Sequence, residues 1–341
     1  MSPEDVVSRT RVGVGLFDMA HRGLLEVRGA DRVRWLDGMI SGDVEALERA
    51  EPGAGCYAVL LTNRGAIIAD LHVARFEDRY LLESLRSEIP RIVETLERYV
   101  IADDVVLTDR SAEFASLGLE GPGAPVVLEM ATNGQIANLE PEQWAESTIG
   151  GRDVLVAGFG FSGECGFQIR MKPGDRDVVE KALAAAAKGD GLVRGDLEAL
   201  EILRVEAGLP ALGSELDDEV LPPEARLERA ISTSKGCYVG QEIVARLRAR
   251  GQVNHLLVGL RLESSTLPIV GTKLMAEGRV TGEVTSVALS PTEGPIALGF
   301  VRREHAETGT QIEFEGGRAS IAALPFVAGL AGLDAQASGV T

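Results

Sequence analysis

Cysteine is scarce in this sequence, and the cysteines that occur lie far apart. The chain has 341 residues and 3 cysteines, Cys56, Cys165 and Cys237, and no two of them form a CxxC pair. This spacing excludes a disulfide framework and a self-contained four-cysteine metal site. We therefore expect free thiols, no resident metal ion and a reducing, cytoplasmic environment.

Positive charge is also in deficit. The chain carries 34 Lys and Arg residues against 52 Asp and Glu residues, which gives a formal net charge of -18 at pH 7. General neutralisation of nucleic-acid phosphates needs clustered basic side chains, so nucleic acid is not an expected partner. Arg246, Arg248 and Arg250 form one local basic strip. Such a strip can attract a polyanionic tail or simply be a solvated helix face.

Long apolar runs are absent as well. No apolar segment approaches the ~20 residues that span a bilayer, and the opening MSPEDVVSRT lacks a basic region followed by an apolar one. We therefore expect no direct membrane contact. The chain is nevertheless 45% hydrophobic, and its length suffices for two or three domains, each with its own core.

Strand and helix patterns alternate up to about residue 250. Segments 57–62 and 66–74 have strand-like patterns on either side of the turn Asn63-Arg64-Gly65, which predicts a hairpin, and residues 87–100 have helical spacing. Asp196 predicts the start of a helix that ends at Gly208. Together these patterns indicate an α+β protein with mixed sheets and packed helices.

The character of the sequence changes after Gly251. Short alternating segments separated by Gly and Pro predict a small all-β unit over residues 251–327. Residues 328–341 are mostly small and carry no capping signals, which predicts a flexible tail. The remaining region, 9–250, is expected to hold an inserted lobe at about 45–120.

The densest chemical motif is Lys-Gly-Cys-Tyr-Val-Gly-Gln-Glu at residues 235–242. Helical spacing follows it, so Cys237 is expected just before a helix N-terminus and beside Lys235. A neighbouring cation and a helix N-terminus both lower the pKa of a thiol, which makes Cys237 a candidate nucleophile or metal ligand. The alternative is a small buried residue in a tight turn.

Glu206 lies in the last turn of the helix that Asp196 begins. A carboxylate there faces the negative end of the helix dipole, which costs about 0.3–1 kcal/mol. The position therefore suggests a specific partner for the charge. That partner could be a ligand or, as the simpler alternative, a salt bridge with a residue such as Arg204.

Several motifs in order resemble the folate-binding superfamily of the glycine-cleavage T-protein (aminomethyltransferase). The similarity runs over nearly the whole chain, and the motif at 235–242 resembles the YgfZ-type branch of that superfamily, whose members support iron–sulfur enzymes. The resemblance implies a folate-binding fold with a ferredoxin-like lobe over residues 9–250 and a C-terminal antiparallel β-barrel over residues 251–327. The matching segments are DMAHRGLLEVRGADRVRWLDGMISGDV, RGAIIADL, GFSGECGFQI, RVEAGLPALGSEL and GEVTSVALSPTEGPIALGFV.

The resemblance also implies roles for individual residues. Glu206 would bind the pterin ring of tetrahydrofolate, for which one carboxylate can accept two parallel hydrogen bonds. Lys235 would match a basic position of the folate site, with its motif neighbour Tyr238 beside the ligand. Asp70 would match the catalytic acid of the transferase near the folate nitrogen that accepts the one-carbon unit, and Tyr57 an aromatic residue of the pocket.

The sequence departs from the transferase pattern at several positions. The paired aspartates of the transferase correspond to Ala69-Asp70, so one acid is retained, and Cys165 stands where that family often has an acid. In the transferase an acid typically stands where Cys237 is found. These departures weigh against an intact transferase reaction.

Two functions follow from the resemblance. The first is a tetrahydrofolate-binding accessory protein in which Cys237 assists assembly or repair of iron–sulfur clusters in client proteins. The second is a tetrahydrofolate-dependent aminomethyl or one-carbon transferase in which Asp70 acts as the acid–base residue. A third possibility is a relic of the fold that serves protein contacts alone.

Overall fold

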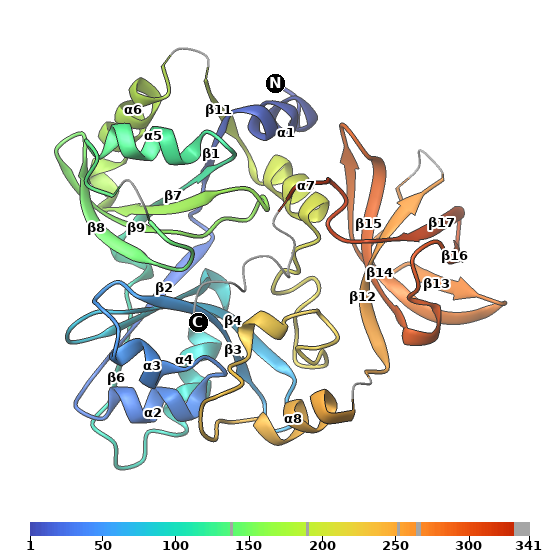
Figure 1. Cartoon of the computed structure of the whole chain (residues 1–341), viewed down its shortest axis with the longest axis horizontal. Coiled ribbons are helices and arrows are strands. Elements are labelled where there is room, and N and C mark those ends of the chain that lie inside the picture. Colours follow the sequence, from blue (N-terminus) through green and yellow to red (C-terminus); the bar gives the residue numbers. More distant parts are fainter. Residues whose placement is uncertain (137–138, 189–190, 251–252, 264–266, 331–341) are drawn as a thin grey trace.

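The chain folds into three lobes in the computed structural model: a six-stranded sheet, a five-stranded sheet and a closed barrel (Figure 1). This confirms the predicted α+β class with a C-terminal antiparallel β-barrel. None of the described helices is long and apolar enough to cross a membrane. The structure describes the chain except for five segments: 137–138, 189–190, 251–252, 264–266 and 331–341.

The six-stranded sheet has the order β11-β1-β7-β10-β9-β8. Strands β1 and β11 pair in parallel, and the other neighbours pair antiparallel. Helices α5 (Ala124–Ala131) and α6 (Arg176–Ala186) bury apolar side chains against one face of this sheet. The strands are β1 Val14–Asp18, β7 Ala115–Glu120, β8 Trp144–Ile149, β9 Arg152–Ala157, β10 Gly166–Met171 and β11 Leu192–Gly195.

The five-stranded sheet has the order β3-β4-β5-β2-β6, and the predicted hairpin forms its β3–β4 pair. The sequence predicted a lobe at about 45–120. The sheet also contains β2, which comes before that range in the sequence. Three helices cover one face: α2 Arg32–Met39, α3 Val44–Glu48 and α4 Ile89–Glu97. The strands are β2 Arg22–Arg28, β3 Gly55–Leu61, β4 Ile67–Arg75, β5 Tyr80–Leu85 and β6 Val106–Asp109.

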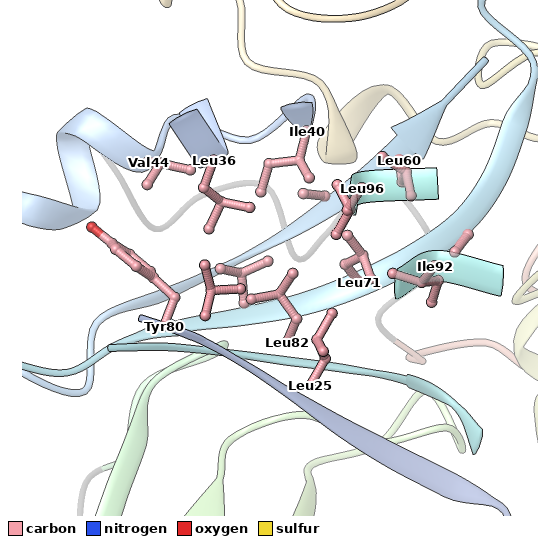
Figure 2. Packing of buried hydrophobic residues seen from close by; sticks show 14 of the residues in the cluster. Leu25, Leu36, Ile40, Val44, Leu60, Leu71, Tyr80, Leu82, Ile92 and Leu96 are labelled. Carbon is pink, nitrogen blue, oxygen red and sulfur yellow. The ribbon is translucent and has the colours of Figure 1, made fainter. Parts of the chain in front are cut away.

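Strand β4 shows how this sheet separates core from site. Successive side chains of a strand point to opposite faces. Leu71 therefore packs with Leu36 and Ile40 of the α2 region in the core beneath the helices (Figure 2). Asp70 and His72 lie on the opposite face, which packs toward the six-stranded sheet through residues such as Trp144.

The C-terminal lobe is a closed barrel of order β12-β15-β14-β13-β16-β17. Closure pairs every strand on both sides, so the barrel presents no free edge. The tail predicted at 328–341 falls largely on residues outside the described part of the chain. The strands are β12 His255–Leu262, β13 Lys273–Ala276, β14 Arg279–Ser290, β15 Gly294–Arg302, β16 Gln311–Phe314 and β17 Gly317–Ala322.

Helix α7 (Leu197–Ala207) lies between the lobes, next to the barrel strand β14 and the N-terminal helix α1 (Pro3–Val12) (Figure 1). Its ends are those that the sequence predicts. Asp196 accepts a hydrogen bond from the backbone N–H of Ala199 at 3.0 Å, and Gly208 closes the helix with φ of 68°. These caps fix the length of the helix that carries much of the candidate site.

Candidate functional site

A cavity of about 270 Å³ lies between the five-stranded sheet and α7. Apolar side chains supply part of its wall: Leu200 on α7, Leu209 just after it, Leu85 at the end of β5, and Phe161 from the loop between β9 and β10. Its polar lining residues are His21, Arg22, Asp70, Glu201, Arg204 and Ser214. An apolar pocket with a few convergent polar groups is typical of a small-molecule site.

Asp70 brings a carboxylate into this cavity from the middle of β4. Its Oδ2 atom accepts a hydrogen bond from Tyr57 Oη at 3.1 Å. Burial and the neighbouring Asp70 raise the pKa of Tyr57 well above its usual value, so the hydroxyl stays protonated and can donate. Asp70 Oδ1 is buried and has no hydrogen-bond partner within the described chain. A buried acceptor without a partner is the natural place for an N–H group of a ligand.

Arg22 reaches the cavity from the start of β2. Its Nε atom donates a hydrogen bond to the fully buried Glu83 on β5, and its guanidinium lies 4.9 Å from the ring centroid of Phe161. Arg170, from the six-stranded sheet, lies 3.4 Å from the second oxygen of Glu83. Burial alone would raise the pKa of Glu83, but the two arginines outweigh burial and lower it. One ionised carboxylate thus ties the two sheets together and orients Arg22.

His72 sits two residues beyond Asp70 on the same face of β4. Its Nδ1 atom lies 2.8 Å from Glu142 Oε2, and its ring stacks on Phe159 with centroids 3.6 Å apart. Glu142 lies just before β8 and Phe159 lies just after β9, so both belong to loops of the six-stranded sheet. His72 therefore anchors the strand that carries Asp70 and leaves the carboxylate of Asp70 free to face the cavity.

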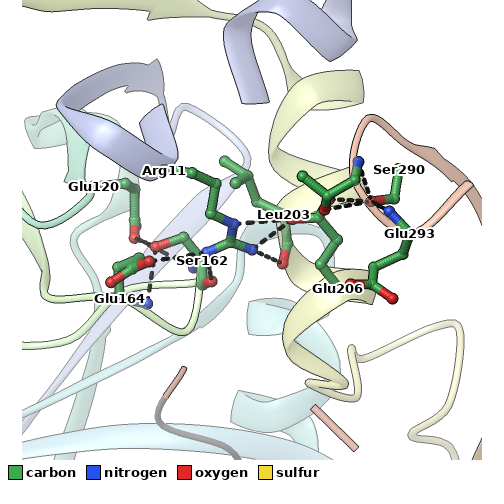
Figure 3. A network of polar contacts seen from close by, with 9 residues as sticks. Arg11, Glu120, Ser162, Glu164, Leu203, Glu206, Ser290 and Glu293 are labelled. Atoms are coloured by element: carbon green, nitrogen blue, oxygen red, sulfur yellow. Dashed lines mark hydrogen bonds and ion pairs between the residues drawn. The ribbon is translucent and has the colours of Figure 1, made fainter. Parts of the chain in front are cut away.

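Glu206 is fully buried, and both of its carboxylate oxygens have protein partners (Figure 3). Arg11 of α1 donates to Oε2 from Nε at 2.9 Å and from Nη2 at 2.8 Å, and Ser290 of the barrel donates to Oε1 at 2.6 Å. Arg11 also donates to the carbonyl of Leu203 near the helix end. The carboxylate of Glu206 at the C-terminal end of α7 thus has a structural partner, Arg11. Glu206 is not among the residues that line the cavity.

Arg204, which the sequence suggested as an alternative partner for Glu206, has partners of its own. It is buried and donates to Glu201, to Glu215 Oε2 at 2.9 Å, and to Ser286 of the barrel at 2.6 Å. Glu215 in turn accepts from Ser286 Oγ at 2.6 Å. This network fixes the wall of the cavity formed by the end of α7.

Lys235 fastens the segment before α8 to the α2–α3 turn. Its ammonium donates to the carbonyls of Asp37, Ile40 (3.0 Å) and Gly42 (2.7 Å), and it lies 3.1 Å from Asp37 Oδ1. Tyr238 is buried beneath it, with its ring centroid 5.3 Å from Lys235 Nζ. Burial lowers the pKa of Lys235, and Asp37 offsets part of that effect. Neither Lys235 nor Tyr238 lines the cavity.

Cys237 is exposed and lies just before α8 (Gln241–Arg250), where the sequence predicted a helix. It is not among the residues that line the cavity, so the thiol and the Asp70 carboxylate do not share one site. Of the predicted basic strip, Arg246 pairs with Glu242 at 3.0 Å, whereas the side chain of Arg250 lies outside the described residues. Across the described residues, no group of three or more His, Cys, Asp or Glu side chains could hold a metal ion.

Glu120, at the end of β7, holds the loop that carries Phe161. Its carboxylate accepts from the backbone N–H of Phe161 at 3.1 Å, and from the N–H and Oγ of Ser162 at 3.3 and 2.8 Å. Burial raises the pKa of Glu120 to about 7, because these hydrogen bonds and the nearby Arg11 offset only part of the desolvation cost. The placement of one cavity wall thus depends on a titratable group.

Sequence reasoning placed Asp70 and Tyr57 together but missed Arg22 and His72. His72 had a usable signal, since it follows Asp70 by two positions in an alternating strand and must share its face. Arg22 had no such signal, because its neighbours Glu83 and Phe161 lie on β5 and in the loop after β9, which are remote from it in sequence.

Known proteins resemble this chain over nearly its full length. The family described as "GCVT N-terminal domain" matches residues 4–235, and "Glycine cleavage T-protein C-terminal barrel domain" matches residues 256–327. The aminomethyltransferase of Streptomyces coelicolor is 32% identical over 333 residues, which are 95% of this chain and 88% of the relative. The aminomethyltransferase of Geobacillus kaustophilus is 33% identical over 324 residues, 93% of this chain and 88% of the relative.

A solved structure agrees with these relatives. The crystal structure of glycine cleavage system aminomethyltransferase T from Bartonella henselae matches with a TM-score of 0.85 and 26% identity. The match covers 96% of this chain and 90% of that one. The agreement extends through all three lobes, so it includes every element that forms the cavity.

Proposed function

This chain belongs to the glycine-cleavage T-protein family, and from that premise we propose that it transfers a one-carbon unit from an aminomethyl donor to tetrahydrofolate. The curated relatives are named aminomethyltransferases, which favours the transferase over the YgfZ-type branch. The observation that carries the proposal is Asp70, whose buried Oδ1 atom has no hydrogen-bond partner among the described residues and lies in a cavity with partly apolar walls.

The cavity residues fit the ring of a reduced folate. At about 270 Å³ the cavity is close to the lower end of ligand pockets, roughly 300–1,000 Å³, which suits the flat ring of the ligand better than its whole length. Leu200 and Phe161 offer apolar surfaces to a ring. Among the described residues that line the cavity, three buried polar atoms have no hydrogen-bond partner: Asp70 Oδ1, Arg22 Nη2 and His21 Nδ1. Burial and the charge of Arg22 lower the pKa of His21, so its ring is neutral at pH 7.

The chemistry divides between the ligand and the protein. Tetrahydrofolate, when bound, would supply the ring nitrogen that accepts the one-carbon unit. Asp70 Oδ1 would take up the proton that this nitrogen loses and return it to the departing amine, so that ammonia leaves as the first new carbon–nitrogen bond is made. The bond between the carbon and the carrier of the donor would break as the second folate nitrogen bonds the carbon, and the proton of that nitrogen would go to the departing carrier. Tyr57 Oη holds the other oxygen of Asp70 in place.

The proposal is tested by comparing Asp70→Asn with Cys237→Ala. Loss of a positioned acid–base group costs about 10²–10⁴-fold in rate, so Asp70→Asn should form methylenetetrahydrofolate that much more slowly. Cys237→Ala should react like the wild type, because Cys237 does not line the cavity. Failure to detect methylenetetrahydrofolate from any aminomethyl donor, or full activity in Asp70→Asn, would count against the proposal.

A second candidate function draws on the exposure of Cys237. As an accessory protein for iron–sulfur clusters, the chain would use this thiol transiently while a client protein supplied the remaining ligands, since clusters are normally held by four cysteines. In that case Cys237→Ala, rather than Asp70→Asn, would impair cluster-dependent enzymes in the cell. The comparisons give no support to this role. The three cysteines are free, which fits a reducing cytoplasm under either of the two candidate functions.

A further inference from the structure

The cavity lining holds both an unsatisfied hydrogen-bond donor and an unsatisfied acceptor, and the proposed function uses only the acceptor. Arg22 Nη2 and Asp70 Oδ1 are both buried and have no partner among the described residues. The two side chains line the same cavity, and no ion pair joins them in the part of the chain that the structure describes. An unsatisfied donor and an unsatisfied acceptor that line the same cavity suggest that one ligand satisfies both.

We propose that Arg22 determines which ring the cavity accepts, by donating a hydrogen bond to a ring carbonyl oxygen next to the nitrogen that faces Asp70. This inference rests on the proposed function and extends it to the choice of ligand. In a tetrahydropterin with an oxygen at C4, the carbonyl at C4 and the N–H at N5 project side by side from neighbouring rings. One is an acceptor and the other a donor, which is the complement of Arg22 and Asp70.

The surroundings of Arg22 hold its guanidinium ready for this role. Glu83 fixes Nε from one side, and Phe161 lies beneath the planar group at 4.9 Å. Burial alone would lower the pKa of Arg22, but the carboxylates of Glu83 and Asp70 outweigh burial and raise it. The donor is therefore charged, oriented and desolvated before the ligand arrives, which strengthens a hydrogen bond to a carbonyl oxygen.

The same geometry should reject a ring that carries an amino group at C4. That substitution replaces the acceptor with a donor, so two donors would face each other and Arg22 Nη2 would stay unsatisfied. Buried polar groups left without partners are what give a site strong selectivity. An apolar pocket without Arg22 would distinguish the two rings far less.

The experiment measures the affinity of the wild type and two variants for tetrahydrofolate and for its 4-amino analogue. The wild type should prefer tetrahydrofolate by about a hundredfold or more. Arg22→Gln should bind tetrahydrofolate about ten- to hundredfold more weakly and lose most of the preference. Arg170→Gln is the matched control, because it also removes a buried arginine next to Glu83 but does not line the cavity; it should keep the preference.

The comparison of the two rings in the wild type tests the inference even if Arg22→Gln fails to fold. Equal affinity of the wild type for the two rings would overturn the role of Arg22 and leave the proposed function intact. An unchanged preference in a folded Arg22→Gln would do the same. Absence of binding to either ring would overturn the proposed function and this inference together.

Discussion

At the scale of single residues, the site is built from side chains whose hydrogen-bonding groups are only partly satisfied by the protein. Tyr57 donates to one oxygen of Asp70, and the other is buried without a hydrogen-bond partner among the described residues. Glu83 occupies the Nε atom of Arg22 and leaves Nη2 open. Unsatisfied buried groups cost stability, and such costs are typical of sites that a ligand completes.

Lys235 is the opposite case, because the protein supplies hydrogen-bond acceptors and a counter-charge for its buried ammonium group. Its ammonium is enclosed by three backbone carbonyls and Asp37. Lys235→Met should lower the free energy of unfolding by about 3 kcal/mol, since removing one partner of a buried pair leaves the other unsatisfied. Arg246→Met, which breaks an exposed pair with Glu242, should cost at most about 0.5 kcal/mol. Urea denaturation measures both.

The same variant separates two roles for Lys235. The resemblance of the motif implied that Lys235 contacts folate, whereas the structure gives its ammonium to the α2–α3 turn. A stable Lys235→Met protein that has lost affinity for reduced folate would favour the ligand role. A destabilised protein that still binds folate when folded favours the structural one.

At the scale of elements, Glu120 makes the stability of the loop with Phe161 depend on pH. The pKa of Glu120 is raised from its usual 4.5 to about 7, so between these values the folded chain holds a proton that the unfolded chain has lost. Stability therefore falls as pH rises through this window, by up to about 3 kcal/mol. Glu120→Gln should flatten this slope, as measured by urea denaturation at several values from pH 5 to 8.

Glu146→Gln serves as the control for that series. Glu146 is exposed, so its replacement should leave the wild-type slope unchanged. An equal slope in Glu120→Gln and the wild type would show that the carboxyl group of Glu120 does not titrate in this range.

Elements with local signals could be predicted from the sequence, and contacts between distant elements could not. Asp196 and Gly208 define α7 because capping depends on a few neighbouring residues. The partner of Glu206 could not be found in this way. Arg11 belongs to another helix almost the whole domain away in sequence, and only the packing of α1 against α7 brings the two charges together.

At the scale of the whole molecule, the cavity exists because separate parts of the chain converge on α7. The five-stranded sheet contributes Asp70 and Arg22, and the loop of the six-stranded sheet contributes Phe161. The barrel contributes no lining residue within the described chain, but Ser286 and Ser290 bind the side chains of α7 from outside. The resemblance of ordered motifs predicted this architecture, whereas the composition of the cavity wall required the structure.

The most direct test of the account is the binding of tetrahydrofolate to the wild type and to Leu200→Trp, measured by isothermal titration calorimetry. Leu200 lines the cavity from α7, so a tryptophan there should occupy the space of the ring. Thermal unfolding would establish that the variant is folded, since overpacking costs typically about 1–3 kcal/mol. We predict binding by the wild type and a loss of at least about tenfold in Leu200→Trp, equivalent to ~1.4 kcal/mol. Wild-type affinity in a folded Leu200→Trp protein would contradict the claim that this cavity receives the folate ring.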